Sequence, residues 1–297
     1  MNLLIVTQKV DKNDPVLGFF HRWIEEFAKW CESITVVCLE MREHHLPTNV
    51  KVLSLGKEKG KVKIKYLLRF FKYIWSERNN YDAVFVHMNQ EYVLLGWKFW
   101  KLWGKRIFLW RNHAHGNLFT RLAILFSDKV FCTSPSSYTA RFKKTKIMPV
   151  GIDTDFFKPD PNIIRKKDSI LLLGRISPVK KVLEFIDWVK DKDFVTTIAG
   201  PILVEDKEYG QIVQHRVLNS KGKIVYIGPV NQEEAKKLYQ TNEIYANFTS
   251  AGSMDKTIIE AAACGCKLEV RNPDLKNFRV EDHSLQLLME KIKMEIS

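Results

Sequence analysis

Short apolar runs recur along the chain and alternate with longer stretches whose apolar residues follow helical spacing. Phe19–Trp30 belongs to the second kind, since Phe20, Trp23, Ile24 and Phe27 would share one helical face. Strands are predicted at Leu3–Thr7, Ile34–Leu39, Val50–Leu55, Ala83–His87, Arg106–Trp110, Lys129–Thr133 and Ile147–Val150. This alternation predicts a parallel, doubly wound α/β sheet.

A charged segment with two prolines, Gly151–Lys167, interrupts the alternation and is interpreted as a linker. A second series follows, with strands predicted at Ser169–Leu173, Phe194–Ala199, Lys223–Ile227, Glu243–Phe248 and Lys267–Val270. The predicted boundaries are 1–150 for an N-terminal domain, 151–167 for the linker and 168–297 for a short C-terminal domain. Ligands of such folds are expected at the carboxyl ends of the strands.

The composition is that of a folded protein. Of the 297 residues 45% are hydrophobic, which excludes a disordered chain. No apolar run approaches the roughly 20 residues that a membrane span needs, and the N-terminal MNLLIVTQKV lacks the features of a signal peptide. Five cysteines without a metal-binding spacing indicate buried thiols in a reducing compartment, so a cytoplasmic protein is expected.

The formal net charge of +13 favours partners that carry phosphate. Two basic segments, 57–78 and 96–105, have aromatic residues between their lysines. Each segment, taken singly, is expected to pack its aromatic face on a sheet and leave its lysines in water. Together they favour peripheral contact with an anionic membrane, which would be its inner face for a cytoplasmic protein.

The segment Asn247–Val270 carries the most specific chemistry. A turn of small residues precedes a helix-like run in which Asp255 suits the first turn and Gly265 suits the end. Backbone N–H groups at a helix start can bind an anion, and Glu260 could accept hydrogen bonds from sugar hydroxyls. The pattern therefore suggests a nucleotide or nucleotide-sugar site. The alternative is an ordinary αβ unit that binds nothing.

Two motifs resemble those of retaining GT-B glycosyltransferases of the glycosyltransferase family 4 type. IIEAAACGCKLEV resembles their donor-binding segment, where Glu260 matches the second glutamate of E-x7-E and Gly252 stands in place of the first. GRISPVKK resembles the element that grips the donor phosphates; Lys180 matches its lysine, and Lys181 stands where glycine is usual. The resemblance spans most of the chain and is strongest from Pro149 to Val270.

The resemblance implies an α/β protein with the GT-B fold, in which two Rossmann-like domains face a cleft. The N-terminal domain would hold the acceptor, and the C-terminal domain the nucleoside-diphosphate-sugar donor. The implied activity is metal-independent transfer of a hexosyl group to an acceptor hydroxyl, with retention, in glycan or glycolipid biosynthesis. The acceptor would be a glycan or a lipid-linked molecule. No cofactor is expected, and Asp153-Thr154-Asp155 is interpreted as part of an interdomain connection and not as a metal motif.

The resemblance also assigns site residues. His113 matches a histidine near the donor sugar, Arg175 and Lys180 would stabilise the leaving diphosphate, and these three are the predicted catalytic residues. The predicted donor-binding residues are Gly18, Gly174, Ile227, Gly228, Gly252, Ser253, Met254, Asp255, Lys256 and Glu260. His115, the second choice for this histidine, is assigned to the acceptor side together with Asn89 and Glu91, which are assigned by position alone.

Glycine at position 252 argues against a carboxylate nucleophile and fits substitution on one face of the sugar, with Asp255 and Lys256 taking over sugar contacts. It also leaves open a nucleotide-sugar-binding protein with weak catalysis. A GT-B epimerase or phosphorylase is a further alternative. A basic nucleic-acid-binding protein is the most distant one, because no nucleic-acid motif is recognised and no nucleic-acid partner is expected.

Overall fold

The computed structural model describes residues 1–60, 62–250, 254–275 and 277–296, which form two compact units. The first unit comprises Met1–Pro149 together with the C-terminal segment from Gln286, and the second comprises Val150–Leu285. This division differs from the predicted boundaries at both ends of the second domain. The C-terminal helix lies in the first unit, and the segment interpreted as a linker lies in the second.

The first unit is built on a seven-stranded sheet in the order β3-β2-β1-β4-β5-β6-β7, with every neighbouring pair parallel. The strands are β1 (Asn2–Val10), β2 (Ser33–Met41), β3 (Val50–Ser54), β4 (Ala83–His87), β5 (Arg106–Trp110), β6 (Lys129–Cys132) and β7 (Thr145–Ile147). All five residues of β4 are buried. Such continuous apolar runs form strands covered on both faces, which confirms the doubly wound prediction.

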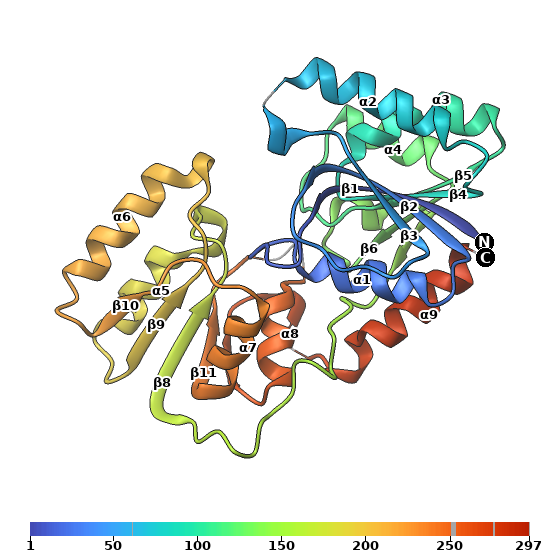
Figure 1. Cartoon of the computed structure of the whole chain (residues 1–297). Coiled ribbons are helices and arrows are strands. Elements are labelled where there is room, and N and C mark those ends of the chain that lie inside the picture. Colours follow the sequence, from blue (N-terminus) through green and yellow to red (C-terminus); the bar gives the residue numbers. More distant parts are fainter. Residues whose placement is uncertain (61, 251–253, 276, 297) are drawn as a thin grey trace. The chain divides into compact units, whose positions relative to one another are not determined.

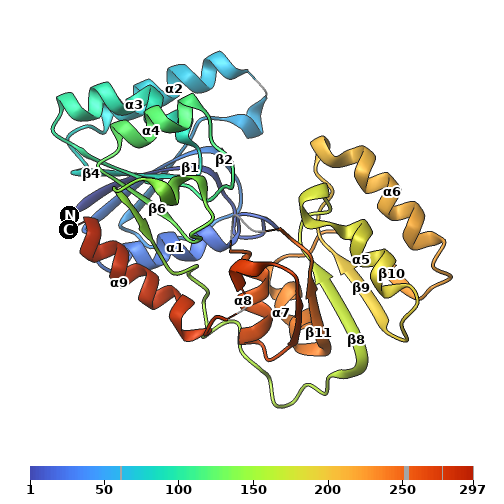
Figure 2. The same cartoon turned by 180° about the vertical axis from the view of Figure 1, so that it is seen from behind.

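Helices cover both faces of this sheet. The α2 (Lys63–Ser76), α3 (Gln90–Leu102) and α4 (Leu118–Phe126) helices lie together on one face, and α1 (Phe19–Ala28) and α9 (Leu285–Ile296) lie on the other (Figures 1 and 2). The predicted apolar face of α1 is buried. The α9 helix is held to the first unit by an ion pair of 2.7 Å between Lys129 Nζ and Glu295 Oε2.

The second unit contains a five-stranded parallel sheet in the order β10-β9-β8-β11-β12. Its strands are β8 (Lys166–Leu173), β9 (Val195–Ala199), β10 (Ile224–Tyr226), β11 (Asn242–Asn247) and β12 (Lys267–Val270), and its helices are α5 (Val182–Val189), α6 (Lys207–Leu218), α7 (Gln232–Thr241) and α8 (Lys256–Ala263). Successive residues of β8 enter different cores, since Leu171 packs with α7 and α8 and Leu172 packs with α5 and α6. This period of two fixes the strand's register.

The segment interpreted as a linker is part of the core of the second unit. Ile152 and Phe157 are buried, and Ile152 exchanges backbone hydrogen bonds of 2.8 Å with His283 and Leu285. Its prolines and lysines are exposed, which explains why its composition resembled a linker, whereas Arg165 donates hydrogen bonds to the Tyr239 and Asn242 carbonyls. Six short 3-10 turns complete the described elements, at residues 57–59, 138–141, 178–180, 204–206, 273–275 and 281–283.

Candidate functional site

Three glycines stand at the carboxyl ends of adjacent strands in the second unit: Gly174 after β8, Gly200 after β9 and Gly228 after β10. The Gly200 N–H donates a hydrogen bond of 2.7 Å to the Gly228 carbonyl, and the Gly174 N–H donates to the Ala199 carbonyl at 3.0 Å. A Cβ on Gly200 would lie 1.8 Å from the Gly174 carbonyl oxygen. The strand ends thus meet through backbone hydrogen bonds and carry no Cβ at these three positions, so a ligand can approach the backbone closely there.

Lys180 and Asp255 form a buried ion pair beside this edge. Lys180 lies in the turn that follows β8, and its ammonium group donates a hydrogen bond to the Asp255 carboxylate at the start of α8. Their side chains are 17% and 9% exposed. The methylene carbons of Lys180 lie 3.7 and 3.9 Å from the position of a Cβ on Gly174. The pair therefore fixes a cation next to the glycine-lined edge.

The Asp255 carboxylate is saturated with donors. Besides Lys180, it accepts hydrogen bonds from Asn247 Nδ2 at 2.9 Å, Thr249 Oγ1 at 3.3 Å and Thr257 Oγ1 at 3.0 Å. Burial acts to raise the pKa of Asp255, but the Lys180 charge and these hydrogen bonds outweigh it, and the pKa is lowered. Asp255 is thus a fixed carboxylate that orients Lys180.

Glu260, which is buried, and Lys256, which is half-buried, lie one turn apart on α8. Glu260 is 7% exposed and accepts a hydrogen bond of 3.2 Å from the Tyr239 hydroxyl. Burial raises the pKa of Glu260 to about 7, although the Lys256 charge acts in the opposite direction. Burial likewise lowers the pKa of Lys256 to about 8, against the effect of Glu260 and Asp153. The Lys256 ammonium donates to the Gly151 carbonyl at 2.9 Å.

The stability of the protein is expected to have a minimum near neutral pH because of this pair. Native Glu260 keeps its proton up to about pH 7, whereas the unfolded chain releases it near 4.5, so the free energy of unfolding falls as pH rises between these values. Native Lys256 releases its proton near pH 8 and unfolded Lys256 near 10.5, so stability recovers above about pH 8. The free energy of unfolding, measured by urea denaturation across this range, should show both the fall and the recovery.

The control for this profile is a pair of matched substitutions. Glu260→Gln removes the titrating group and should abolish the fall between pH 4.5 and 7. Glu208→Gln, at an exposed position on α6, should keep the wild-type profile. Identical profiles in all three proteins would show that Glu260 does not carry the effect.

The structure shows fewer contacts for the other residues predicted on the donor side. Arg175 is half-buried, and the described residues offer its guanidinium group no hydrogen bond or ion pair. The nearby Ser177 hydroxyl is buried and has no partner among the same residues. Ile227 is 46% exposed, and Met254 packs against the core under α7 and α8. Gly252 and Ser253 lie outside the described residues. The Arg175 guanidinium group and the Ser177 hydroxyl, both in the turn after β8, are therefore available to a ligand.

In the first unit, Gly18 has a structural reason to be glycine. Its N–H donates to the Asp14 carbonyl at 3.0 Å, and a Cβ would lie 2.6 Å from the Asp14 oxygen and 3.0 Å from that of Lys12. The close packing of this turn requires a glycine whether or not a phosphate approaches. A donor-binding role for Gly18 stays a prediction.

His113 and His115 form a turn after β5 and are both exposed. The His115 N–H donates to His113 Nδ1 at 3.0 Å, and the His113 backbone N–H donates to the Ser137 hydroxyl oxygen at 3.2 Å. The turn therefore orients the His113 ring, while its predicted place near a donor sugar stays a prediction. Arg111, just before this turn, was not singled out from the sequence. One of its guanidinium nitrogens, Nη1, is buried without a partner among the described residues.

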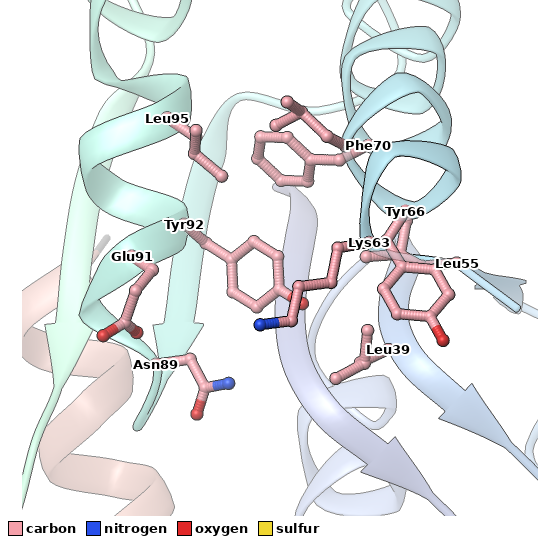
Figure 3. A pocket seen from close by; sticks show the side chains of 10 residues that line it. Leu39, Leu55, Lys63, Tyr66, Phe70, Asn89, Glu91, Tyr92 and Leu95 are labelled. Atoms are coloured by element: carbon pink, nitrogen blue, oxygen red, sulfur yellow. The ribbon is translucent and has the colours of Figure 1, made fainter. Parts of the chain in front are cut away.

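Asn89 and Glu91 flank the start of α3, after β4, and line a cavity of about 430 Å³ in the first unit (Figure 3). Gln90, between them, does not line the cavity, and its side-chain oxygen is buried without a partner among the described residues. Glu91 also interacts electrostatically with Arg111. The carboxyl edge of the first sheet thus collects polar groups beside a cavity. The cavity itself was missed from the sequence, because its walls come from segments far apart in the chain.

The aromatic residues of the two basic segments largely pack inward, as expected for each segment singly. Phe70 and Trp100 are buried, and Trp97 stacks on Phe126 with ring centroids 3.9 Å apart. Ile64 and Leu68 remain 59% and 63% exposed. Among the described helices none is both long and apolar enough to cross a bilayer. Peripheral membrane contact stays a prediction.

Asp153 has a structural role in the described chain. Its Oδ1 accepts hydrogen bonds from the backbone N–H groups of Asp155 and Phe156 at 3.1 and 3.0 Å, which closes a turn. Within the ranges that the structure describes, no group of three or more His, Cys, Asp or Glu residues could hold a metal ion. Metal independence of the expected reaction stays a prediction.

Two parallel α/β units of seven and five strands define the GT-B fold. Solved glycosyltransferase structures share it over the whole chain. The chain is similar to HepE from Anabaena in complex with UDP and glucose, with a TM-score of 0.71, 15% identity, and coverage of 100% of this chain and 90% of that one. For sucrose-phosphate synthase from Thermosynechococcus elongatus the values are 0.73, 13%, 99% and 89%.

A glycosyltransferase from Rickettsia africae is also similar, with a TM-score of 0.70, 13% identity, and coverage of 99% of this chain and 97% of that one. No family model and no curated protein matches the chain. The similarity is therefore one of fold, and the sequence identities are too low to assign a specific activity to this chain.

Proposed function

We propose that the protein is a retaining glycosyltransferase of the family 4 type that moves a hexosyl group from a nucleoside-diphosphate sugar to an acceptor hydroxyl, in glycan or glycolipid biosynthesis. The observation that carries the proposal is the cation of Lys180, fixed by Asp255 beside the edge formed by Gly174 and Gly200. A diphosphate needs such an arrangement of positive charge and open backbone. HepE, a protein of the same fold, was solved with UDP-glucose.

In the proposed reaction, the bond between the anomeric carbon and the diphosphate oxygen breaks while the acceptor oxygen bonds to that carbon on the same face. The acceptor proton passes to the leaving phosphate oxygen. Lys180 and the available guanidinium group of Arg175 stabilise the negative charge as it develops. No carboxylate nucleophile is invoked, because Asp255 is engaged by four donors and residue 252 is glycine.

Glu260 is assigned to the nucleotide. Among the described residues its carboxyl group accepts one hydrogen bond, from Tyr239, and it lies on the helix that begins at the Lys180–Asp255 pair. We assign it to the ribose hydroxyls of the donor, which would donate hydrogen bonds to it. Above about pH 7, where Glu260 is ionised, a hydrogen bond to this charged group contributes about 1.5–3 kcal/mol, so loss of the contact should weaken nucleotide binding there about tenfold to a hundredfold.

The proposal predicts that one class of nucleotide sugar raises the melting temperature of the protein, because a ligand that binds only the folded state stabilises it. UDP, GDP and ADP sugars should be compared by thermal unfolding of the wild type and of Glu260→Ala. We expect stabilisation by one base and its loss in Glu260→Ala. Glu208→Ala, at an exposed position on α6, is the matched control and should respond like the wild type.

If no nucleotide sugar shifts the melting temperature, at concentrations far above a micromolar affinity, the proposal is rejected. The alternative of a basic nucleic-acid-binding protein, which rests on the net charge, would then be favoured. A shift that persists in Glu260→Ala would keep the donor site but reject the role of Glu260. Once the base is known, product formation with an added acceptor alcohol separates transfer from epimerisation, and dependence on inorganic phosphate would identify a phosphorylase.

A further inference from the structure

The cavity of the first unit lies at the edge of the sheet where ligands of α/β folds bind. Leu39 is near the end of β2, Leu55 follows β3, and Asn89 follows β4. The remaining walls come from α2 and α3. Open α/β sheets bind their ligands at the carboxyl ends of the strands, and the volume of about 430 Å³ lies within the range of small-molecule sites.

The lining is mostly apolar and is polar at one end. Seven of its ten residues are leucine or aromatic: Leu39, Leu55, Tyr66, Leu67, Phe70, Tyr92 and Leu95. The other three are Lys63, Asn89 and Glu91. Figure 3 shows Asn89, Glu91 and the Lys63 ammonium toward one end, while Leu95 and Phe70 lie toward the other. An occupant that fits this lining has an apolar body and a polar end.

The sequence of α2 shows how the cavity wall arises. Lys63, Tyr66, Leu67 and Phe70 occur at helical intervals of three and four, so they share the face of α2 turned toward α3. Phe70 is fully buried, whereas Lys63 is exposed, so the wall runs from the core to the surface. The cavity is therefore accessible to a ligand from solvent and is not a sealed packing defect.

One polar group inside the cavity is available for a ligand. The Tyr92 hydroxyl has no hydrogen-bond partner among the described residues, and Figure 3 shows it turned toward the Lys63 ammonium. Burial raises the pKa of Tyr92 to about 12, so the hydroxyl stays a donor at neutral pH. With Asn89 and Glu91 it forms a set of donors and acceptors suited to the hydroxyl groups of a sugar or alcohol.

We propose that this cavity receives the apolar chain or ring of the acceptor, so that the acceptor is an amphiphile: an alkyl or aryl body with a hydroxyl-bearing polar end. The apolar body lies among Leu67, Phe70 and Leu95, and the polar end contacts Asn89 and Glu91. The assignment to the acceptor rests on the proposed glycosyl transfer. The preference for an apolar body rests only on the cavity.

The test is binding of an alkyl β-glucoside series, from methyl to octyl, to the full chain below micelle-forming concentrations, by titration calorimetry. Burial of each methylene contributes about 0.8 kcal/mol, so affinity should rise about fourfold for each added carbon. Leu95→Trp fills the cavity and should weaken octyl glucoside binding at least tenfold. Leu102→Trp lies on the same helix at a position 81% exposed and should bind like the wild type.

Tyr92→Phe keeps the packing of the wall and removes its free hydroxyl, so it reports on the site even where Leu95→Trp fails to fold. We expect it to weaken binding of every glucoside by a similar factor of about fivefold, the value of one hydrogen bond. Affinity that is independent of chain length, or that Leu95→Trp leaves unchanged, would overturn the cavity proposal.

Nucleotide-sugar stabilisation, measured on the same variants, separates the two proposals. Chain-length-dependent binding in a protein that no nucleotide sugar stabilises would reject glycosyl transfer, and with it the acceptor assignment, while supporting an apolar ligand. Stabilisation by a nucleotide sugar without chain-length dependence would reject the amphiphilic acceptor alone. Labelled sugar transferred from the stabilising donor to octyl glucoside more than tenfold faster than to methyl glucoside would support both.

Discussion

Replacing Lys180 with alanine is expected to lower the free energy of unfolding by about 3 kcal/mol and kcat/KM by at least about a hundredfold. The loss of stability follows from the burial of Asp255, whose side chain is 9% exposed and would lose its counter-ion. The hydrogen bonds from Asn247, Thr249 and Thr257 remain, which keeps the loss at the lower end for a broken buried pair. The loss of activity follows from removal of a cation at the leaving diphosphate.

The double variant Lys180→Ala/Asp255→Asn separates these two effects. It removes both charges, so part of the lost stability should return, while activity should stay as low as in the single variant. Urea unfolding and steady-state kinetics with the stabilising nucleotide sugar are the measurements. Equal stability of the wild type and the single variant would show that the pair contributes nothing, and unchanged kcat/KM in Lys180→Ala would reject its role in the reaction.

Gly200→Ala is expected to destabilise the protein by about 4 kcal/mol or more, an effect large enough to prevent folding of the second unit. The new Cβ would lie 1.8 Å from the backbone oxygen of Gly174, which no side-chain movement can relieve. The backbone φ of +135° adds strain for any residue with a Cβ. Because the clash falls on the edge proposed for the diphosphate, any folded fraction should also bind nucleotide poorly.

Gly222→Ala is the matched control for this substitution. Gly222 has a φ of +83°, but open space surrounds the position of its Cβ. It should therefore show only the conformational cost, about 1 kcal/mol. Thermal unfolding of the two variants is the measurement. Similar losses in both would show that the close contact between Gly174 and Gly200 relaxes without cost.

The sequence predicted the strands and the order of α/β elements well, because short continuous apolar runs in a folded chain mostly form buried strands. It also predicted helix α8 with Glu260 on it, since Asp255 and Gly265 mark its start and end. The predicted strand Ile147–Val150 was displaced, however, because the structure has β7 at Thr145–Ile147. Apolar residues beyond the strand enter a buried connection to the second unit, where Val150 is 3% exposed.

The candidate site was less accessible from the sequence. Lys180 and Asp255 were each singled out, but not as a pair, because they are 75 residues apart and meet only when β8 pairs with β11. Asn247 and Thr249 were missed for the same reason. The sequence motif at Gly18 suggested a phosphate contact, whereas the structure supplies a packing reason for that glycine. Local patterns predict elements, and contacts between distant elements require the topology.

The division of the chain has a consequence for synthesis. Because α9 belongs to the first unit, the polypeptide leaves that unit near Pro149 and returns to it near Gln286, so the second unit is an insertion within the first. During translation, the apolar face of α9, with Leu288, Met289 and Ile292, emerges after the second unit. The first unit therefore keeps part of its apolar surface uncovered until the whole second unit has been made, and a ribosome-bound fragment ending before α9 exposes a surface that chaperones recognise.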